Sequence, residues 1–353
     1  MLAFRNQVTV LDAGALHWSC FLADLHLHPG LNAYYLKRDL GRAHTPPKRW
    51  NPLRQQVDLP RAEEGGLRVL TACAYAPVIP GFPKPFRAAL GAIEALEALC
   101  ANNPLRAQVA LRRGEIGPIL AAGKLAVIHA AEGGHHLEGS LEKLEQLAAR
   151  GLRYLTLTHF VHNGIAQPAV LPNLIPFRLF RGAPGLTPFG ALVVKKCEEL
   201  GVLVDLTHCS DRSFADVATL ATKPLLATHT GFRRFYPAER NLSDEMLKTI
   251  ARSGGMVGVI SWDKLLAERK ASLENMIDTL VHGALVAGAE HLGIGTDFDG
   301  WVSSASGIRE ARHYPGITVE LAKRGFNEGE IRGILGGNYL RVLGETQARA
   351  PAG

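Results

Sequence analysis

The sequence predicts an α/β fold of the (β/α)8 TIM-barrel class, and three observations lead to this prediction. Eight short apolar runs alternate with longer segments whose apolar residues recur at helical spacing. Several of the runs are apolar on both faces, as strands buried on both sides should be. Histidines and acids follow the runs where each strand would end, and the carboxyl ends of the strands form the functional face of such barrels.

The predicted strands and helices alternate through the chain. The strands are expected at residues 20–27, 68–76, 125–130, 154–158, 202–207, 224–228, 255–261 and 292–296. The helices are expected at residues 86–101, 106–121, 141–149, 188–200, 211–220, 243–252, 272–287, 317–323 and 328–343. Ser243 precedes two acids, which is typical of a helix start, and Gly201 supplies the left-handed residue that often ends a helix.

Two long segments interrupt this pattern. Residues 31–66 and 160–187 would be extended connections after the first and fourth strands, and connections of this length in a compact domain are usually functional. The sequence contains no internal repeat, low-complexity tract or obvious linker. We therefore expect residues 1–353 to form a single barrel domain.

The composition limits the classes of molecule that the protein is expected to bind and the compartment in which it is expected. The net charge of +6 is dispersed along the 353 residues, which does not indicate nucleic-acid binding. The five cysteines are scattered without a C-x-x-C pair, which favours a reducing compartment, and we expect a cytoplasmic location. No stretch of eighteen apolar residues occurs, so we expect no membrane partner. The expected partner is a small-molecule substrate. Assembly into a homodimer is an open alternative.

The first predicted strand ends in the pattern Asp24-Leu25-His26-Leu27-His28. Successive side chains of a strand point to opposite faces, so Asp24, His26 and His28 share one face. Two imidazoles and a carboxylate at a strand end can hold a divalent metal, most commonly zinc. Histidines satisfied by hydrogen bonds on a half-exposed strand are the alternative for this motif taken alone.

The other strand ends carry polar residues in the same register. They are Glu132, His159, His208, His229 and Asp297. Buried histidines that merely make hydrogen bonds in the core would not be expected to recur at six strand ends. It therefore favours a metal site at the carboxyl end of the barrel.

The residue types suit a site with two metal ions. His26, His28, His208 and His229 supply imidazoles, and Glu132 can bridge two ions. Two ions about 3.5–4 Å apart lower the pKa of a shared water and hold a carbonyl or phosphoryl oxygen. Asp297 is the expected general base, which takes a proton from water and returns it to the leaving group. Asp24 would orient a ligand histidine or contact a metal directly.

Five stretches and a closing segment carry a family resemblance. They are Asp24-x-His26, Glu132-Gly133-Gly134, residues 155–159 with Asn163, residues 185–190 running on to 204–208, residues 228–229 through Arg240-Asn241 to 297–300, and residues 337–343. Together they resemble the renal (membrane) dipeptidase family of metallopeptidases, within the amidohydrolase group of TIM barrels. The resemblance spans nearly the whole chain.

The resemblance implies a function and a set of roles. It implies a zinc-dependent dipeptidase, including activity on dipeptides that end in a D-residue, with two zinc ions held by His26, the residue at position 28, Glu132, His208 and His229. Asp297 would act in proton transfer. His159 would polarise the substrate carbonyl or stabilise the tetrahedral intermediate, and Arg240 would bind the terminal carboxylate, which suits a guanidinium fork.

One residue departs from the family pattern. The family has an aspartate two residues after its first histidine, where this sequence has His28, giving the His-x-His of the wider amidohydrolase group. A neutral ligand in place of an anion should make a bound water more acidic. This departure leaves open another amidohydrolase activity on a small amide.

Two further classes of function stay as alternatives. A TatD-like metal-dependent nuclease or phosphoesterase combines a similar ligand set and would explain the basic charge, but not residues 185–190 or the Arg240-Asn241 pair. A non-catalytic, metal-stabilised scaffold would have no need of Asp297 as a proton shuttle. We therefore expect a zinc-dependent dipeptidase.

Overall fold

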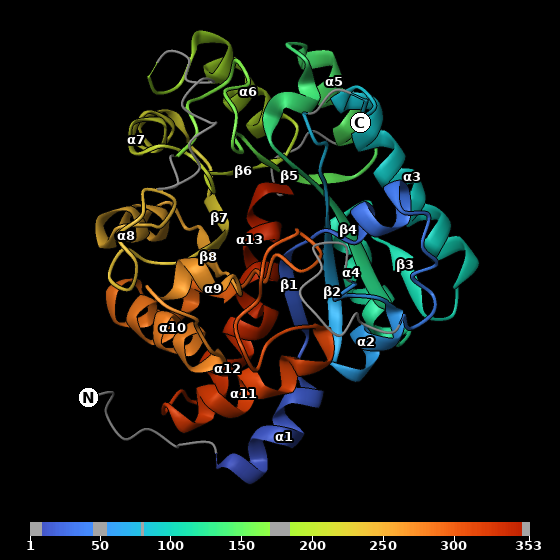
Figure 1. Cartoon of the computed structure of the whole chain (residues 1–353), viewed down its shortest axis with the longest axis vertical. Coiled ribbons are helices and arrows are strands. Elements are labelled where there is room, and N and C mark those ends of the chain that lie inside the picture. The colour runs from blue at the N-terminus through green and yellow to red at the C-terminus, as the bar shows by residue number, and fades with distance from the viewer. Residues whose placement is uncertain (1–8, 45–54, 79–80, 170–183, 348–353) are drawn as a thin grey trace.

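The predicted (β/α)8 barrel is confirmed in the structure, a computed structural model that describes residues 9–44, 55–78, 81–169 and 184–347. Eight parallel strands form the barrel (Figure 1). They are β1 (Leu22–Leu27), β2 (Leu67–Ala74), β4 (Leu125–Glu132), β5 (Leu152–Thr156), β6 (Leu203–Asp205), β7 (Leu225–Thr230), β8 (Met256–Val259) and β9 (Leu292–Ile294). Each pairs with the next, and β9 pairs with β1 to close the ring.

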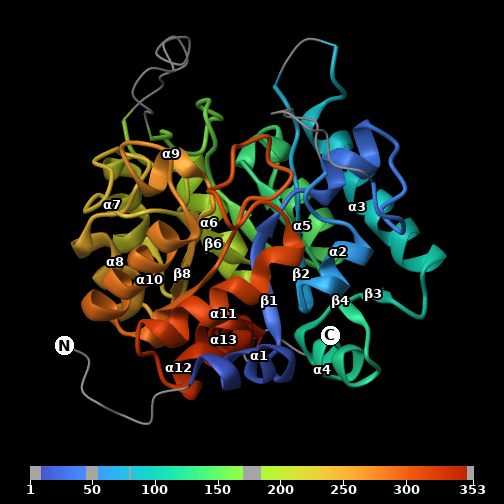
Figure 2. The ribbon, with the colours of Figure 1, turned by 60° about the horizontal axis from the view of Figure 1, so that its bottom comes forward.

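The helices lie outside the strands, as Figure 2 shows from a second direction. In chain order they are α1 (Val10–Ser19), α2 (Leu59–Glu64), α3 (Pro85–Asn102), α4 (Arg113–Ala121), α5 (Leu141–Ala149), α6 (Pro188–Glu199), α7 (Asp211–Leu220), α8 (Asp244–Arg252), α9 (Asp263–Leu266), α10 (Leu273–Ala287), α11 (Tyr314–Lys323), α12 (Glu328–Arg332) and α13 (Asn338–Gln347). Within the described residues, no helix combines the length and the apolar character needed to cross a bilayer.

The strands are buried on both faces, which is why the sequence reads as apolar runs. Every residue of β1, β4 and β7 is buried, including the polar ones. The barrel interior holds large side chains such as Leu25, Tyr154 and Met256, together with Tyr339 of α13. Arg341 of α13 donates to the carbonyls of Gly254, two residues before β8, and of Glu290, in the 3-10 turn Ala289–His291 that precedes β9. Helix α13 therefore closes the amino end of the barrel and leaves the carboxyl end open.

The prediction of one helix was partly wrong. Residues 106–121 were expected to be helical, whereas Ala107–Val109 form the short strand β3 and the helix begins only at Arg113. Strand β5 pairs with β4 only from His129 onward, so Leu125–Val127 would have an open edge. Strand β3 pairs with that edge and satisfies its backbone groups.

The predicted helix at residues 328–343 is divided. It consists of α12, the π-helical turn Gly333–Gly337 and α13. At the break, a Cβ on Gly336 would lie 2.0 Å from the carbonyl oxygen of Phe21. The close approach of this turn to the start of β1 therefore requires glycine here.

The two long connections follow β1 and β5, as predicted. The first runs from residue 28 to 66 and contains the turn Leu31–Tyr35 and helix α2. The described part of the second packs back on the barrel through bridges between Ala166 and Leu186 and between Pro168 and Cys209. Most of the apolar segment at residues 169–177 lies outside the described residues.

Candidate metal centre

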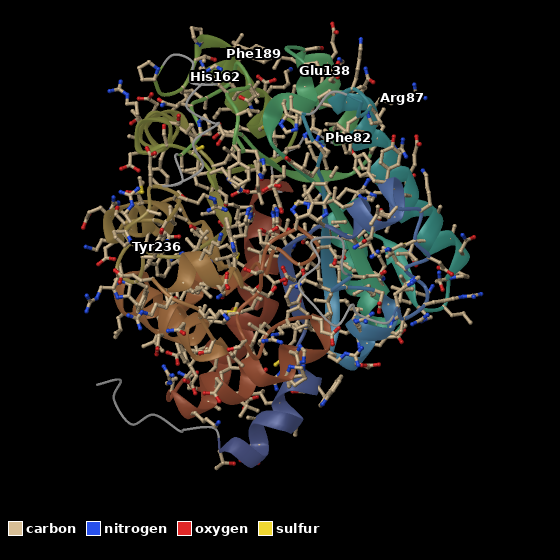
Figure 3. The ribbon with its side chains drawn as sticks, in the orientation of Figure 1. Phe82, Arg87, Glu138, His162, Phe189 and Tyr236 are labelled. Atoms are coloured by element: carbon tan, nitrogen blue, oxygen red, sulfur yellow. The ribbon has the colours of Figure 1, made fainter. Side chains whose placement is uncertain are left out.

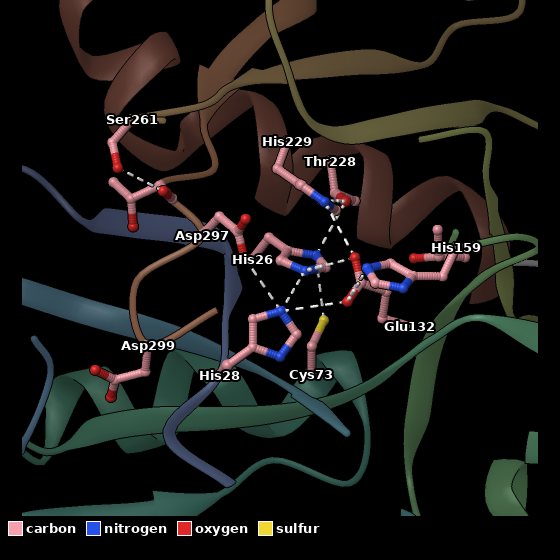
Figure 4. Close-up of polar contacts among 12 residues, drawn as sticks. His26, His28, Cys73, Glu132, His159, Thr228, His229, Ser261, Asp297 and Asp299 are labelled. Carbon is pink, nitrogen blue, oxygen red and sulfur yellow. Dashed lines mark hydrogen bonds and ion pairs between the residues drawn. The ribbon is translucent and has the colours of Figure 1, made fainter. Parts of the chain in front are cut away.

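The carboxylate of Glu132 lies at the centre of the open end of the barrel, surrounded by imidazoles (Figure 4). Its Oε1 is 3.5 Å from Nε2 of His26, 3.2 Å from that of His208 and 3.1 Å from that of His229. Its Oε2 is 3.4 Å from Nε2 of His28 and 3.7 Å from Nε2 of His159. The structure therefore brings together around Glu132, from the ends of four other strands, the histidines that the sequence analysis selected.

Asp297 completes this group from the end of β9. Its Oδ1 is 3.2 Å from Nε2 of His28, and the residue is 7% exposed. Its backbone N–H donates to the carbonyl of His26, which ties the end of β9 to the end of β1. Asp297 and His208 both have a left-handed φ, of 61° and 68°, which costs energy in a non-glycine residue and is common at functional sites.

The arrangement fits metal ions better than a network of hydrogen bonds. Nε2 of His26 lies 3.0 Å from Nε2 of His28, and Nε2 of His208 lies 3.2 Å from Nε2 of His229. Burial lowers the pKa of His159 to about 3 and the pKa of His208 and His229 well below the ordinary value. Neutral imidazoles facing one another around a carboxylate are the donor set of a transition-metal site.

Asp24 lies behind this group, in the barrel wall. Its carboxylate accepts from the backbone N–H of His26 at 3.0 Å and from the hydroxyls of Thr296 and Tyr314 at 2.6 Å each. Burial raises the pKa of Asp24 to about 6. Asp24 thus contacts His26 through its backbone rather than its ring, and it fixes the residue before Asp297.

Two glycines make room directly after Glu132. Gly133 has a φ of 87°, and a Cβ on Gly134 would lie 2.2 Å from Ile165 and 3.0 Å from the carbonyl oxygen of Leu157. The Gly-Gly pair therefore lets the chain leave β4 sharply while the carboxylate of Glu132 stays at the centre.

Several residues that the sequence analysis did not identify contact the Nδ1 atoms of the imidazoles, on the side of each ring away from Glu132. The Thr228 hydroxyl donates to Asp205 at 2.7 Å and lies 3.0 Å from Nδ1 of His229. The Tyr154 hydroxyl lies 2.8 Å from Nδ1 of His26. In the sequence, these contacts are signalled only by Asp205, an acid within an otherwise apolar strand. A buried acid needs hydrogen-bond partners, so its presence predicts polar neighbours.

A second missed contact holds the loop that carries Asp297. The backbone N–H of Gln56 donates to Asp299 at 2.6 Å, and the Asp299 N–H donates to the Gln56 side chain at 3.1 Å. A Cβ on Gly300 would lie 2.1 Å from Oδ1 of Asp297. The long β1–β2 connection thus fixes the loop that follows β9 across 243 residues of sequence.

Arg240 lies beside the imidazoles on the connection from β7 to α8. Its Nε donates to Nδ1 of His208 at 3.1 Å, and its Nη2 donates to the carbonyl of His229 at 2.9 Å. Burial lowers its pKa to about 10, so the guanidinium stays charged at neutral pH. Its Nη1 is buried and has no hydrogen-bond partner within the described residues. That N–H is therefore available to an anionic ligand.

A cavity of about 770 Å³ opens above these residues. Its floor contains His28, Glu132, His159, His208, Arg240 and Asp297. Its walls include Tyr75, Phe160, Tyr236, Trp262 and Trp301; Tyr236 is labelled in Figure 3. A concave, largely apolar pocket with a few converging polar groups is typical of a small-molecule site.

The fold and the site together define a TIM barrel built to bind metal ions and a small ligand. The chain belongs to the membrane dipeptidase family (peptidase family M19), whose family model matches residues 13–352. This is a family of metallopeptidases, which implies metal ions, and the His, Asp and Glu side chains gathered around Glu132 form groups that could hold them.

Individual relatives agree with this assignment. The chain is 31% identical to Dipeptidase 3 of Mus musculus over 298 residues, which are 84% of this chain and 59% of that protein. It spans 56–60% of the length of the curated relatives it matches.

Solved structures share the fold. The probable dipeptidase PvdM from Pseudomonas aeruginosa superposes with a TM-score of 0.85 at 22% identity, covering 97% of this chain and 99% of that one. A metallopeptidase from Rhodobacter sphaeroides, liganded with a phosphinate mimic of the dipeptide L-Ala-D-Ala, superposes with a TM-score of 0.81 at 24% identity, covering 93% and 99%.

Proposed function

We propose that this protein is a zinc-dependent dipeptidase that hydrolyses the peptide bond of small dipeptides, including dipeptides with a C-terminal D-residue. The observation that carries the proposal is the combination of the Glu132 cluster, Asp297 and the unpartnered N–H of Arg240 in one cavity. Membership of the membrane dipeptidase family supports it.

The nitrogen and oxygen donors favour zinc among the common metals. Two ions would be held by His26, His28, Glu132, His208 and His229. When bound, such a pair supplies a Lewis acid for the carbonyl oxygen and acidifies water near neutral pH. His208 and His229 are neutral because they are buried, so each ring keeps one nitrogen lone pair that can serve as a ligand.

Asp297 is assigned to proton transfer. Its carboxylate lies at the cavity floor, 3.2 Å from His28 and close to the Glu132 cluster. From there it takes a proton from the attacking water and delivers it to the amine of the leaving residue. Its left-handed backbone, held by Asp299 and Gln56, keeps the carboxylate at this position.

His159 and Arg240 are assigned to the substrate. His159 is neutral, since burial lowers its pKa to about 3, so its N–H can donate to the oxygen that becomes negative during attack. Arg240 binds the terminal carboxylate through Nη1. Activity on dipeptides with a C-terminal D-residue is supported by the L-Ala-D-Ala mimic bound to the Rhodobacter sphaeroides relative.

The test is a substrate panel on the zinc-loaded protein. We expect hydrolysis of free dipeptides, with L-L and L-D pairs compared directly, and no cleavage of a short DNA or a phosphodiester. Hydrolysis of the DNA with the dipeptides untouched would replace the proposal with the TatD-like nuclease. Cleavage of small amides that lack a carboxylate would favour a different amidohydrolase reaction.

Arg240→Ala tests the carboxylate assignment within the same assay. Removing one partner of a buried charged contact costs roughly 2–5 kcal/mol, so we expect KM for a free dipeptide to rise by roughly 30-fold or more. A dipeptide amide has no terminal carboxylate and serves as the control, with a KM that Arg240→Ala changes far less. Equal effects on both substrates would remove Arg240 from this role.

A further inference from the structure

A buried tyrosine lies in the barrel interior beneath the metal centre. Tyr154 on β5 is fully buried, and its hydroxyl has three close neighbours. The carbonyl oxygen of Leu25, Nδ1 of His26 and Sγ of Cys73 each lie 2.8 Å from the hydroxyl oxygen. Figure 4 shows Cys73 directed toward His26 from the neighbouring strand.

The hydrogens of this group can be assigned one by one. A carbonyl can only accept, so the Tyr154 hydroxyl donates its hydrogen to Leu25. The hydroxyl oxygen then offers only lone pairs to its other two neighbours. The Cys73 thiol lies 2.8 Å from the hydroxyl oxygen and 3.3 Å from Nδ1 of His26, so its single hydrogen goes to the nearer hydroxyl oxygen. Nδ1 of His26 then donates an N–H to the other lone pair of that oxygen.

The remaining hydroxyl near His26 leads to the same assignment. Thr228 Oγ1 is 3.2 Å from Nδ1 of His26, but its hydrogen goes to Asp205 at 2.7 Å. Both hydroxyls therefore present lone pairs to Nδ1, and with the Cys73 hydrogen directed to Tyr154 at 2.8 Å the hydrogen of the His26 ring is assigned to Nδ1. The lone pair of the His26 ring is then on Nε2, the nitrogen that faces Glu132.

We propose that Tyr154 is a positioning residue for the metal centre: its hydroxyl, relayed to the Leu25 carbonyl, holds His26 in the tautomer and ring orientation that present Nε2 to a metal ion. This inference rests on the proposed metal site and adds a residue to it. Tyr154 itself touches neither substrate nor metal. Groups that accept from the far nitrogen of a ligand histidine typically contribute 10- to 100-fold to metal affinity.

The chain offers a matched control for a Tyr154→Phe variant. Tyr339 is also fully buried in the barrel interior, and its hydroxyl contacts Thr71 at 3.2 Å, away from the ligands. Tyr154→Phe and Tyr339→Phe therefore each remove one buried hydroxyl from the same core. Only the first removes a hydrogen bond to a ligand histidine.

The experiment is a zinc titration of the metal-free full-length chain in competition with a chromophoric chelator. We expect wild type and Tyr339→Phe to bind two ions alike, and Tyr154→Phe to bind one of them roughly 10- to 100-fold more weakly. Equal affinities in the two variants would overturn the inference. A wild-type protein that binds no zinc would instead refute the proposed function.

A second measurement needs no variant. Nitrogen NMR of the metal-free wild-type protein distinguishes a protonated from an unprotonated ring nitrogen. We expect the His26 ring to carry its hydrogen on Nδ1. A hydrogen on Nε2 would overturn the inference even if the Tyr154→Phe chain failed to fold.

Discussion

The two halves of the metal centre are built from the same residue types but are held differently. The β1/β9 half comprises His26, His28 and Asp297, the β6/β7 half comprises His208 and His229, and Glu132 lies between them. In the β6/β7 half, Nδ1 of each ring has a hydrogen-bond partner. In the β1/β9 half only His26 has one, because Nδ1 of His28 is buried without a partner among the described residues.

The partners also differ in kind. The Thr228 hydroxyl, which gives its hydrogen to Asp205, can accept an N–H from Nδ1 of His229. The Arg240 guanidinium can only donate, and it lies 3.1 Å from Nδ1 (through Nε) and 3.2 Å from Nε2 (through Nη2) of His208, so it does not select one tautomer of that ring. The histidines therefore differ in the hydrogen bonds that their Nδ1 atoms make, and His28 is the least constrained of them.

Glu132→Gln should have the largest effect, because it removes the link between the halves. An amide keeps the shape but loses the negative charge that two cations share. We expect the zinc content to fall below one ion per chain. We expect turnover to fall by at least about 10³-fold, the scale seen when a group of cooperating residues loses an essential member. Metal analysis and dipeptide assays check this result. Glu138→Gln, on the connection that follows β4 and ion-paired with Lys143, is the control and should leave both quantities unchanged.

Asp297→Asn should affect the β1/β9 half alone and spare metal binding. The amide cannot accept a proton from water, so we expect kcat to fall by roughly 10²-fold or more. Zinc content should stay near the wild-type value, since the five assigned ligands are intact. Measuring kcat and zinc content on the same preparation separates the two effects, and an unchanged kcat would remove Asp297 from proton transfer.

His28→Asp should reduce the difference between this chain and its family. An anionic ligand adds negative charge beside the cations, which then acidify water less. We expect tighter zinc binding and an acid limb of the kcat/KM profile that moves to higher pH by about one unit, which corresponds to about 1.4 kcal/mol. A pH profile of the zinc-loaded variant provides the measurement. A limb that moves to lower pH would show that the charge of residue 28 does not control the reaction.

The sequence was sufficient to predict the part of the site that lies on strands. Alternation in β1 and the polar residue after each apolar run identified His26, His28, Glu132, His208, His229 and Asp297, because strand ends in a barrel meet at one rim. The barrel followed from the same pattern. Strand β3 was missed because its formation depends on an open edge of β4, which is a property of the assembled sheet.

The residues that hold the site could not be predicted in this way. Tyr154 and Cys73 appear in the sequence as ordinary core residues, and their contact with His26 exists only because side chains of β1, β2 and β5 meet in the barrel interior. Gln56 lies on a long connection without a regular pattern, yet it holds Asp299. Such contacts depend on side-chain packing between distant segments, which no local pattern encodes.

His129 provides the smallest expected effect and a reference histidine outside both halves. It lies on the same strand as Glu132 and is buried, and neither ring nitrogen has a hydrogen bond among the described residues. Burial, together with Arg150 and Arg153, lowers its pKa to about 4. The unfolded chain therefore takes up a proton below about pH 6.5, whereas the folded chain does so only near pH 4.

His129→Leu should consequently change the acid sensitivity of the fold and little else. Stability linked to His129 is complete above pH 6.5 and is lost as pH falls toward 4, amounting to about 2 kcal/mol by pH 5. We expect the leucine variant to lose about 2 kcal/mol less unfolding free energy than wild type between pH 7.5 and pH 5, measured by urea unfolding of metal-free protein. Because the ring makes no hydrogen bond in the described structure, leucine breaks none, and zinc binding at pH 7.5 should be unchanged. An identical pH dependence in the two proteins would mean that the acid sensitivity arises from the histidines around Glu132 instead.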